Sequence, residues 1–169
     1  IHGCDALFDA LIAAIEEDDA AAGPADTTAI LLGDLVDRGP GSAKVIATAR
    51  EWGQRRKVRY LAGNHEEMFL ESFEEVGVLR HFLRHGGRET ILSYPIEKSE
   101  FNSLELEPLR QRLHTLVPKE DREFLESFEE IIVAGDYAFV HAGVDPSRPI
   151  EEQARQDMLW IRERFLGHD

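Results

Sequence analysis

Cysteine is almost absent from this sequence: Cys4 is the single thiol in 169 residues. One thiol cannot form an intramolecular disulfide, so a disulfide-stabilised secreted fold is excluded and a reducing, cytoplasmic location is expected. Cys4 itself fits a small residue at a helix start. Apolar runs are short, and none approaches the roughly 18 residues of a membrane-spanning helix. Ile1 opens within a motif rather than in a charged and then apolar stretch, so neither a signal peptide nor a membrane partner is expected.

Positive charge is scarce, because 19 Lys and Arg face 33 Asp and Glu, for a net charge of −14. Such a field repels nucleic-acid phosphates, which argues against a nucleic-acid polymer as partner. It does not exclude a small phosphorylated substrate, because divalent cations reverse the sign of the charge inside a site. Elsewhere the acidic surface is explained by solubility alone.

The apolar pattern predicts an α/β fold in a single domain spanning residues 1–169. Two amphipathic helices alternate with two strands in the first third of the sequence, and Ser42 is the expected N-cap of the second helix. Further on, a Gly-Asp turn separates two apolar runs and predicts a β-hairpin. The predicted helices cover residues 5–18, 42–53 and 151–165, and the predicted strands cover residues 28–32, 57–61, 131–134 and 137–140.

The alternation stops after Glu66, and residues 67–127 read as short helices separated by glycine and proline. We therefore expect a helical insertion, or cap, in this segment. Its aromatic side chains could line a pocket for a ring-shaped ligand or could equally be core; they are Phe69, Phe73, Phe82, Tyr94 and Phe101.

Polar side chains follow three of the apolar runs, in the segments GDLVDRGP (33–40), GNHE (63–66) and HAGV (141–144). Because ligands bind beyond the carboxyl ends of strands, carboxylate, amide and imidazole groups are expected to meet at one sheet edge. Asp34 and Asp37 are spaced to serve different partners, and Arg38 offers a fork of donors suited to phosphate. The alternatives are a Gly-, Asp- and Pro-rich turn with an incidental ion pair, and a structural histidine at position 141.

These three segments, with IHGC at residues 1–4, resemble the signature of the PPP-type metallophosphatases, or calcineurin-like phosphoesterases. The resemblance is greatest to small bacterial and phage serine/threonine phosphatases and to symmetrical diadenosine tetraphosphatases, and it extends to about Arg164. It implies a four-layer αββα sandwich with a helical insertion. It also implies phosphoester hydrolysis, in which a hydroxide activated by two metal ions attacks phosphorus in line.

The resemblance also implies a set of metal ligands. Asp34 would bridge the two ions, because a carboxylate has one oxygen for each. His2 would hold the first ion, while Asn64 and His141 would hold the second. A mixed shell of imidazole, carboxylate and amide favours Mn, with Fe or Zn as alternatives, over Mg or Ca.

By the same resemblance, His65 is the general acid, or an electrostatic stabiliser, at the leaving-group oxygen. Asp37 would hydrogen-bond the other ring nitrogen of His65 and favour its protonated form. Arg38 would bind two phosphate oxygens.

Arg162 lies in a W-x-R segment like that of the small bacterial and phage enzymes, and is the predicted second phosphate clamp. The alternative is a solvated helical arginine paired with Glu163 or Glu66. His81 and His85 stand four apart, a spacing that can chelate metal, but their place in the insertion favours a scaffold role.

Two ligands of the family pattern are missing from this sequence. An aspartate would precede Ile1, and a histidine would follow the W-x-R segment at another strand end. Gly167 and His168 match that second motif poorly and are interpreted as the start of a linker. We therefore expect a catalytic-domain fragment, truncated at both ends, with weak metal binding and little turnover in isolation.

Phosphoserine or phosphothreonine peptides are the favoured substrate class, with diadenosine tetraphosphate as the alternative. A non-catalytic binding domain that keeps only the fold is the competing class of function. The joint presence of Arg38, His65 and Asp37 favours an enzyme, because unpaired polar groups at strand ends cost stability without a function. No oligomeric state is predicted.

Overall fold

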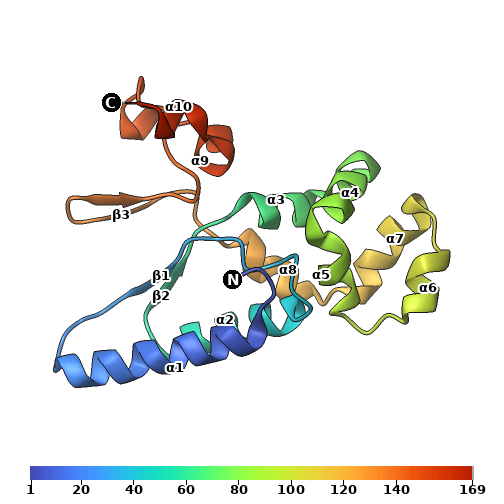
Figure 1. The fold of residues 1–169 in the computed structure, drawn as a ribbon, viewed down its shortest axis with the longest axis horizontal. Coiled ribbons are helices and arrows are strands. Elements are labelled where there is room, and N and C mark those ends of the chain that lie inside the picture. Colours follow the sequence, from blue (N-terminus) through green and yellow to red (C-terminus); the bar gives the residue numbers. More distant parts are fainter. Residues whose placement is uncertain (169) are drawn as a thin grey trace.

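The first two helices pack along each other and form one side of the molecule, as the computed structural model shows for residues 1–168 (Figure 1). They are α1 (Asp5–Ala22) and α2 (Ser42–Arg55). The buried ring of Trp52 meets Phe8 edge to face at 6.4 Å between ring centroids. Leu7 and Leu11, which the helical pattern would place on the buried face, are 72% and 46% exposed. The buried stripe of α1 is therefore narrower than predicted.

Strand β1 (Ala29–Leu31) pairs in parallel with β2 (Val58–Tyr60), and α2 is the crossover between them. Strands β3 (Ile132–Ala134) and β4 (Tyr137–Phe139) form the predicted hairpin as a separate two-stranded sheet. A single parallel bridge from Leu61 to Glu129 leads from one sheet toward the other. The α/β class is confirmed, but the expectation that three strand ends share one sheet edge was wrong, because β4 pairs only with β3 in the part that is described.

The chain between the two sheets is a series of short helices joined by loops. Phe69 and Phe82 stack at 5.3 Å between ring centroids, and all five aromatic side chains considered for a ligand pocket are at most 9% exposed. These rings are therefore core. The elements are α3 (Asn64–Glu71), α4 (Val76–Phe82), the kinked turn η1 (Leu83–Gly87), α5 (Arg88–Leu92), α6 (Lys98–Ser103), α7 (Leu106–Leu116) and α8 (Lys119–Glu126).

The C-terminal segment folds as three short pieces: η2 (Ile150–Glu152), α9 (Arg155–Trp160) and α10 (Glu163–Leu166). The continuous helix predicted over residues 151–165 is thus broken, because Ile161 is extended and Arg162 has φ −137° and ψ −90°. Hydrogen bonds from Trp160 and Arg155 to the carboxylate of Glu67 tie α9 to α3.

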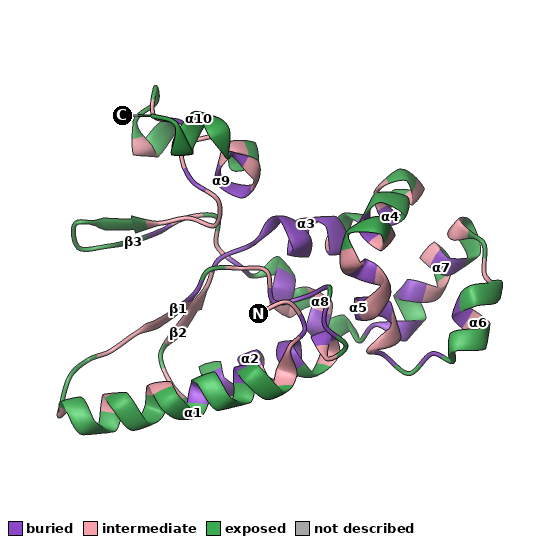
Figure 2. Ribbon diagram, in the orientation of Figure 1, coloured by how far each residue is buried: buried purple, intermediate pink, exposed green. Residues whose placement is uncertain are grey.

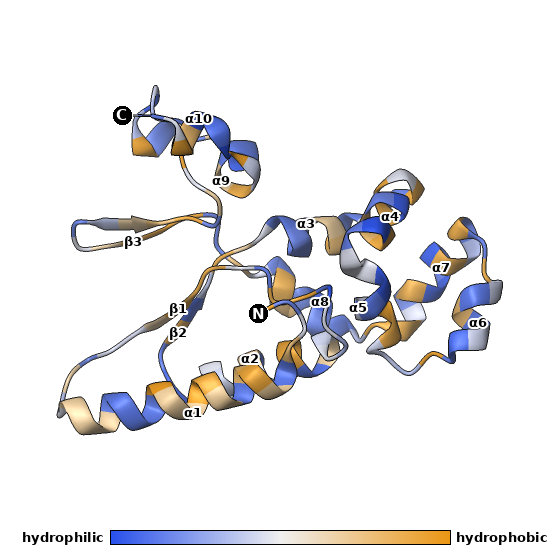
Figure 3. Cartoon of the chain, in the orientation of Figure 1, coloured by the Kyte–Doolittle hydropathy of each residue, from blue (hydrophilic) through white to orange (hydrophobic). Residues whose placement is uncertain are grey.

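Buried residues gather where α2, α3, α5 and α8 meet, while the outer side of α1 and the hairpin are exposed (Figure 2). Apolar residues nevertheless remain on those exposed parts (Figure 3), among them Leu7 and Val133. Among the helices within residues 1–168, none has the length and apolar character needed to cross a bilayer.

Candidate active site

The loop after β1 and the N-terminal turn both have a strained backbone. Within residues 1–168, the non-glycine residues with positive φ are His2 (51°), Asp34 (54°), Asp37 (72°) and Arg38 (68°). All four were predicted from the sequence as site residues. A non-glycine residue in this region costs on the order of 1–3 kcal/mol, and such strain persists where the surrounding structure enforces it, often at functional sites.

The buried carboxylate of Glu66 on α3 is one anchor of this loop. It accepts hydrogen bonds from the backbone N–H groups of Asp34 (2.8 Å), Leu35 (2.7 Å), Val36 (3.2 Å) and Gly63 (2.9 Å). Burial, and then the nearby charge of Asp34, raise the pKa of Glu66, while the amide donors act in the opposite direction. Glu66 therefore shapes the loop and does not pair with an arginine.

The N-terminal turn is a second anchor. The N–H groups of His2 and Gly3 donate to the carbonyls of Asp34 and Leu35, each at 2.8 Å, and Gly39 N–H donates back to His2 at 2.9 Å. A Cβ on Gly3 would lie 2.5 Å from the Gly39 carbonyl oxygen, so only glycine permits this approach. The turn therefore carries His2 directly against the loop.

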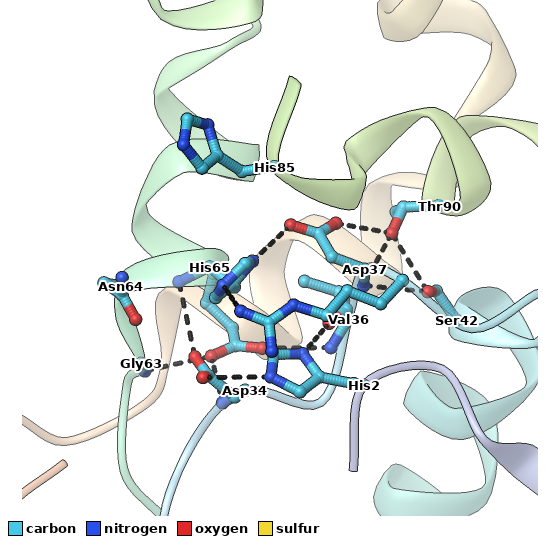
Figure 4. A network of polar contacts seen from close by, with 12 residues as sticks. His2, Asp34, Val36, Asp37, Ser42, Gly63, Asn64, His65, His85 and Thr90 are labelled. Atoms are coloured by element: carbon cyan, nitrogen blue, oxygen red, sulfur yellow. Dashed lines mark hydrogen bonds and ion pairs between the residues drawn. The ribbon is translucent and has the colours of Figure 1, made fainter. Parts of the chain in front are cut away.

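Two histidines face the two carboxylate oxygens of Asp34. His2 Nδ1 donates to the Val36 carbonyl at 3.0 Å, and His2 Nε2 lies 3.4 Å from Asp34 Oδ2 (Figure 4). His141 Nδ1 donates to the Leu32 carbonyl at 2.6 Å, and its Nε2 lies 3.4 Å from Asp34 Oδ1. The carbonyls thereby orient both rings, so that each Nε2 is the nitrogen that faces Asp34. Burial lowers the pKa of His2, which favours the neutral, ligating ring.

This donor set fits a pair of divalent metal ions. Two ligands about 2.1 Å from a common ion at a tetrahedral angle are about 3.4 Å apart, as each histidine is from its Asp34 oxygen. Asn64 Oδ1 lies 3.1 Å from His141 Nε2, the same nitrogen that faces Asp34 Oδ1. His141 thus reaches the site although β4 lies outside the sheet of β1 and β2.

His65 also lies close to His2 and Asp34, and one donor atom from each falls within 4.8 Å of the others. Both ring nitrogens of His65 are already engaged: Nδ1 with Asp37 Oδ2 at 2.6 Å, and Nε2 as acceptor from Arg38 Nη2 at 3.2 Å. The ring therefore fits a proton carrier better than a metal ligand.

Asp37, the partner of His65, is fully buried. Burial raises the pKa of its carboxyl group, while the hydrogen bonds from His65 and Thr90 act in the opposite direction. Thr90 Oγ1 donates to Asp37 Oδ1 at 2.6 Å and accepts the Asp37 N–H at 2.8 Å. Ser42 Oγ lies 2.9 Å from Thr90 Oγ1 and also accepts the Asp37 N–H.

Thr90 was missed in the sequence, because 53 residues separate it from Asp37 and no local pattern marks it. Gly86, which the sequence marked only as a break between short helices, also supports the loop: its carbonyl accepts the Arg38 N–H at 3.1 Å, and its φ is +107°. The prediction that Ser42 is an N-cap was wrong. Helix α2 begins at Ser42 after Gly41, and the Ser42 hydroxyl bonds the loop instead.

The remaining candidates lie around this centre. Exposed Arg162 lines a hollow of about 280 Å³ together with Asp34 and His141. Neither Glu66 nor Glu163 forms an ion pair with Arg162 among the ion pairs of residues 1–168. His81 and His85 are exposed, and His85 Nδ1 donates to the His81 carbonyl at 2.8 Å.

His168 is exposed near the C-terminal end of the described segment, and its N–H donates to the Phe165 carbonyl at 3.4 Å. It is absent from the group of metal-ligating side chains found within residues 1–168.

A carboxylate between two oriented histidines, beside a buried His–Asp pair on an α/β scaffold, is the arrangement expected from the resemblance of the motifs to the metallophosphatases. The family model for calcineurin-like phosphoesterases matches residues 1–168, and the chain belongs to this family. The family resemblance predicted from the motifs is confirmed.

Curated relatives narrow the comparison. The symmetrical bis(5′-nucleosyl)-tetraphosphatase of Acidovorax ebreus is 32% identical over 90% of this chain and 44% of its own length. That of Klebsiella pneumoniae (strain 342) is 29% identical over 94% of the chain and 46% of its own length. The chain thus spans less than half the length of these relatives. A solved structure of a candidate diadenosine tetraphosphatase shares the fold, with a TM-score of 0.56 and 24% identity over 94% of this chain and 54% of that one.

Proposed function

We propose that the protein is a metal-dependent hydrolase that cleaves phosphoric anhydrides of dinucleoside polyphosphates. The observation that carries the proposal is the geometry of Asp34, whose two oxygens each face the Nε2 of a different oriented histidine at 3.4 Å. His2 and Asp34 would hold one ion, and Asp34, Asn64 and His141 the other. Bound ions would neutralise phosphoryl charge and activate water, and the mixed shell favours Mn.

The protein's own side chains supply the remaining functions. Arg38, which already donates to His65, would hold phosphoryl oxygens, and Arg162 would hold them from the adjoining hollow. His65 would carry the proton that the leaving oxygen needs, while the buried carboxylate of Asp37 fixes its ring.

The proposed substrate class rests on the relatives rather than on the motifs. The motifs alone favoured phosphoserine or phosphothreonine peptides, whereas several relatives are named as bis(5′-nucleosyl)-tetraphosphatases, both symmetrical and asymmetrical. Family membership and the preserved site together support an enzyme over a non-catalytic binding domain.

Hydrolysis by the full-length protein in the presence of Mn tests this proposal. We expect turnover of p-nitrophenyl phosphate, and a higher kcat/KM for diadenosine tetraphosphate than for a phosphoserine peptide. His65→Asn should lower kcat a hundredfold or more, the usual contribution of a general acid–base group. His85→Asn, the same change at an exposed histidine, should leave it unchanged. An inactive protein with metal bound would refute the proposal that it is a hydrolase. A higher kcat/KM for the phosphoserine peptide would refute the proposed substrate class.

A further inference from the structure

Trp160 at the end of α9 lines two neighbouring hollows. The first is the one that holds Asp34, His141 and Arg162. The second has a volume of about 340 Å³ and lies among α3, α4 and α9. This is within the size range of small-molecule sites, about 300–1,000 Å³. Its walls include Glu67, Met68, Glu71, Val78, His81 and Trp160.

The indole ring of Trp160 is held in place. Its Nε1–H donates to Glu67 Oε2 at 2.7 Å, and Arg155 Nε donates to the other oxygen of Glu67 at 3.1 Å. The charge of Glu67 is thus balanced, and the plane of the indole is fixed before any ligand arrives. A fixed aromatic face of this kind favours stacking of a flat ring, because little conformational entropy is lost on binding.

The other walls add selectivity. His81 contributes a second ring from α4, and Met68 and Val78 contribute apolar surface. Glu71 is exposed, and its carboxylate has no hydrogen-bond or ion-pair partner among those found for residues 1–168. A free carboxylate at the wall repels phosphate and acidic peptides and accepts hydrogen bonds from an amino group.

We propose that this second hollow is a nucleobase subsite for a base with an exocyclic amino group, such as adenine. The base would stack on Trp160 and direct its amino group to Glu71. The phosphate chain would then pass Trp160 into the hollow of Asp34 and Arg162. This inference rests on the proposed function, because it assigns one half of a dinucleoside polyphosphate.

Binding of free nucleosides tests the subsite without any catalysis. We would titrate adenosine and inosine, which carries a carbonyl in place of the amino group, and follow binding by NMR. Adenosine should bind at least about fivefold more tightly than inosine, and Glu71→Gln should abolish that difference. Glu74→Gln, the same change at an exposed position that does not line the hollow, should preserve it.

Trp160→Leu should weaken the binding of both nucleosides at least about fivefold. Trp160→Phe should retain most of the affinity, because it keeps an aromatic face. A thermal unfolding transition in each variant shows that it is folded. Equal binding of adenosine and inosine, no binding of either, or full affinity in folded Trp160→Leu would overturn the subsite. Failure of the hydrolysis assay with normal adenosine binding would instead count against the proposed reaction alone.

Discussion

Replacing Thr90 with valine should uncouple the insertion from the His65–Asp37 pair. Valine keeps the shape of threonine but removes the hydroxyl that donates to Asp37 Oδ1 at 2.6 Å and accepts the Asp37 N–H at 2.8 Å. Ser42 still accepts that N–H at 3.1 Å, so the main loss is one hydrogen bond to a buried carboxylate. Such a loss costs about 2 kcal/mol of unfolding free energy, or about 4–8 °C in Tm for a chain of this size.

The effect of Thr90→Val on catalysis follows from the same contact. The Thr90 hydrogen bond lowers the pKa of Asp37 against the effect of burial, so its removal should raise that pKa and loosen the orientation of His65. We expect kcat on p-nitrophenyl phosphate to fall about tenfold with little change in KM, since His65 acts on the leaving group rather than in binding. Thr90→Ser retains the hydroxyl and should restore both kcat and Tm. Wild-type kcat and Tm in Thr90→Val would refute the reasoning.

Three further predictions concern the rest of the site. Glu66→Gln should lower the unfolding free energy by about 3 kcal/mol in urea denaturation, because an amide nitrogen would face backbone donors now bound by a carboxylate. An unchanged denaturation midpoint would contradict the role of Glu66 as an anchor of the loop. Gly86→Ala should destabilise the folded protein by at least about 1 kcal/mol in thermal unfolding. The φ of Gly86 is +107°, and the new Cβ would lie 2.7 Å from the backbone nitrogen of Arg38. Its control, Gly77→Ala in α4, meets no atom within 4 Å and should be neutral or stabilising. In metal-free protein, the pKa of His2 is lowered, so the unfolded chain protonates this histidine at a higher pH than the folded protein does. Stability should therefore fall as pH drops through 6.5. His2→Gln should flatten that part of the pH–stability curve measured by denaturation, and an identical slope would show that His2 is not responsible.

Local features of the fold were predictable from the sequence, because each depends on neighbouring residues. The helices beginning at Asp5 and Ser42 and the hairpin around Gly135 follow from apolar spacing and turn chemistry. The histidine, aspartate and asparagine residues of the site were found because they stand in short motifs next to predicted strands. The structure brings these side chains close together, although β4 is not in the sheet of β1 and β2.

What the sequence could not show depends on contacts between distant segments. The hydroxyls of Ser42 and Thr90 meet at Asp37, and neither has a neighbour in sequence that marks this role. The break at Ile161 and Arg162 was missed because the apolar pattern continues through it, and only packing against α3 reveals the end of α9.

The loop from Asp34 to Arg38 is held by three independent parts of the chain, and this explains how it tolerates its strain. The N-terminal turn bonds its start, the carboxylate of Glu66 binds its amides, and the insertion bonds its end through Gly86 and Thr90. Its three left-handed residues, Asp34, Asp37 and Arg38, cost several kcal/mol together, an amount that these hydrogen bonds can offset. Because all three anchors are hydrogen bonds within the protein, the loop should keep its shape when metal is removed. Amide hydrogen exchange at Asp34, Leu35 and Val36 should therefore remain slow in chelator, and rapid exchange there would show that the metal, rather than Glu66, holds the loop.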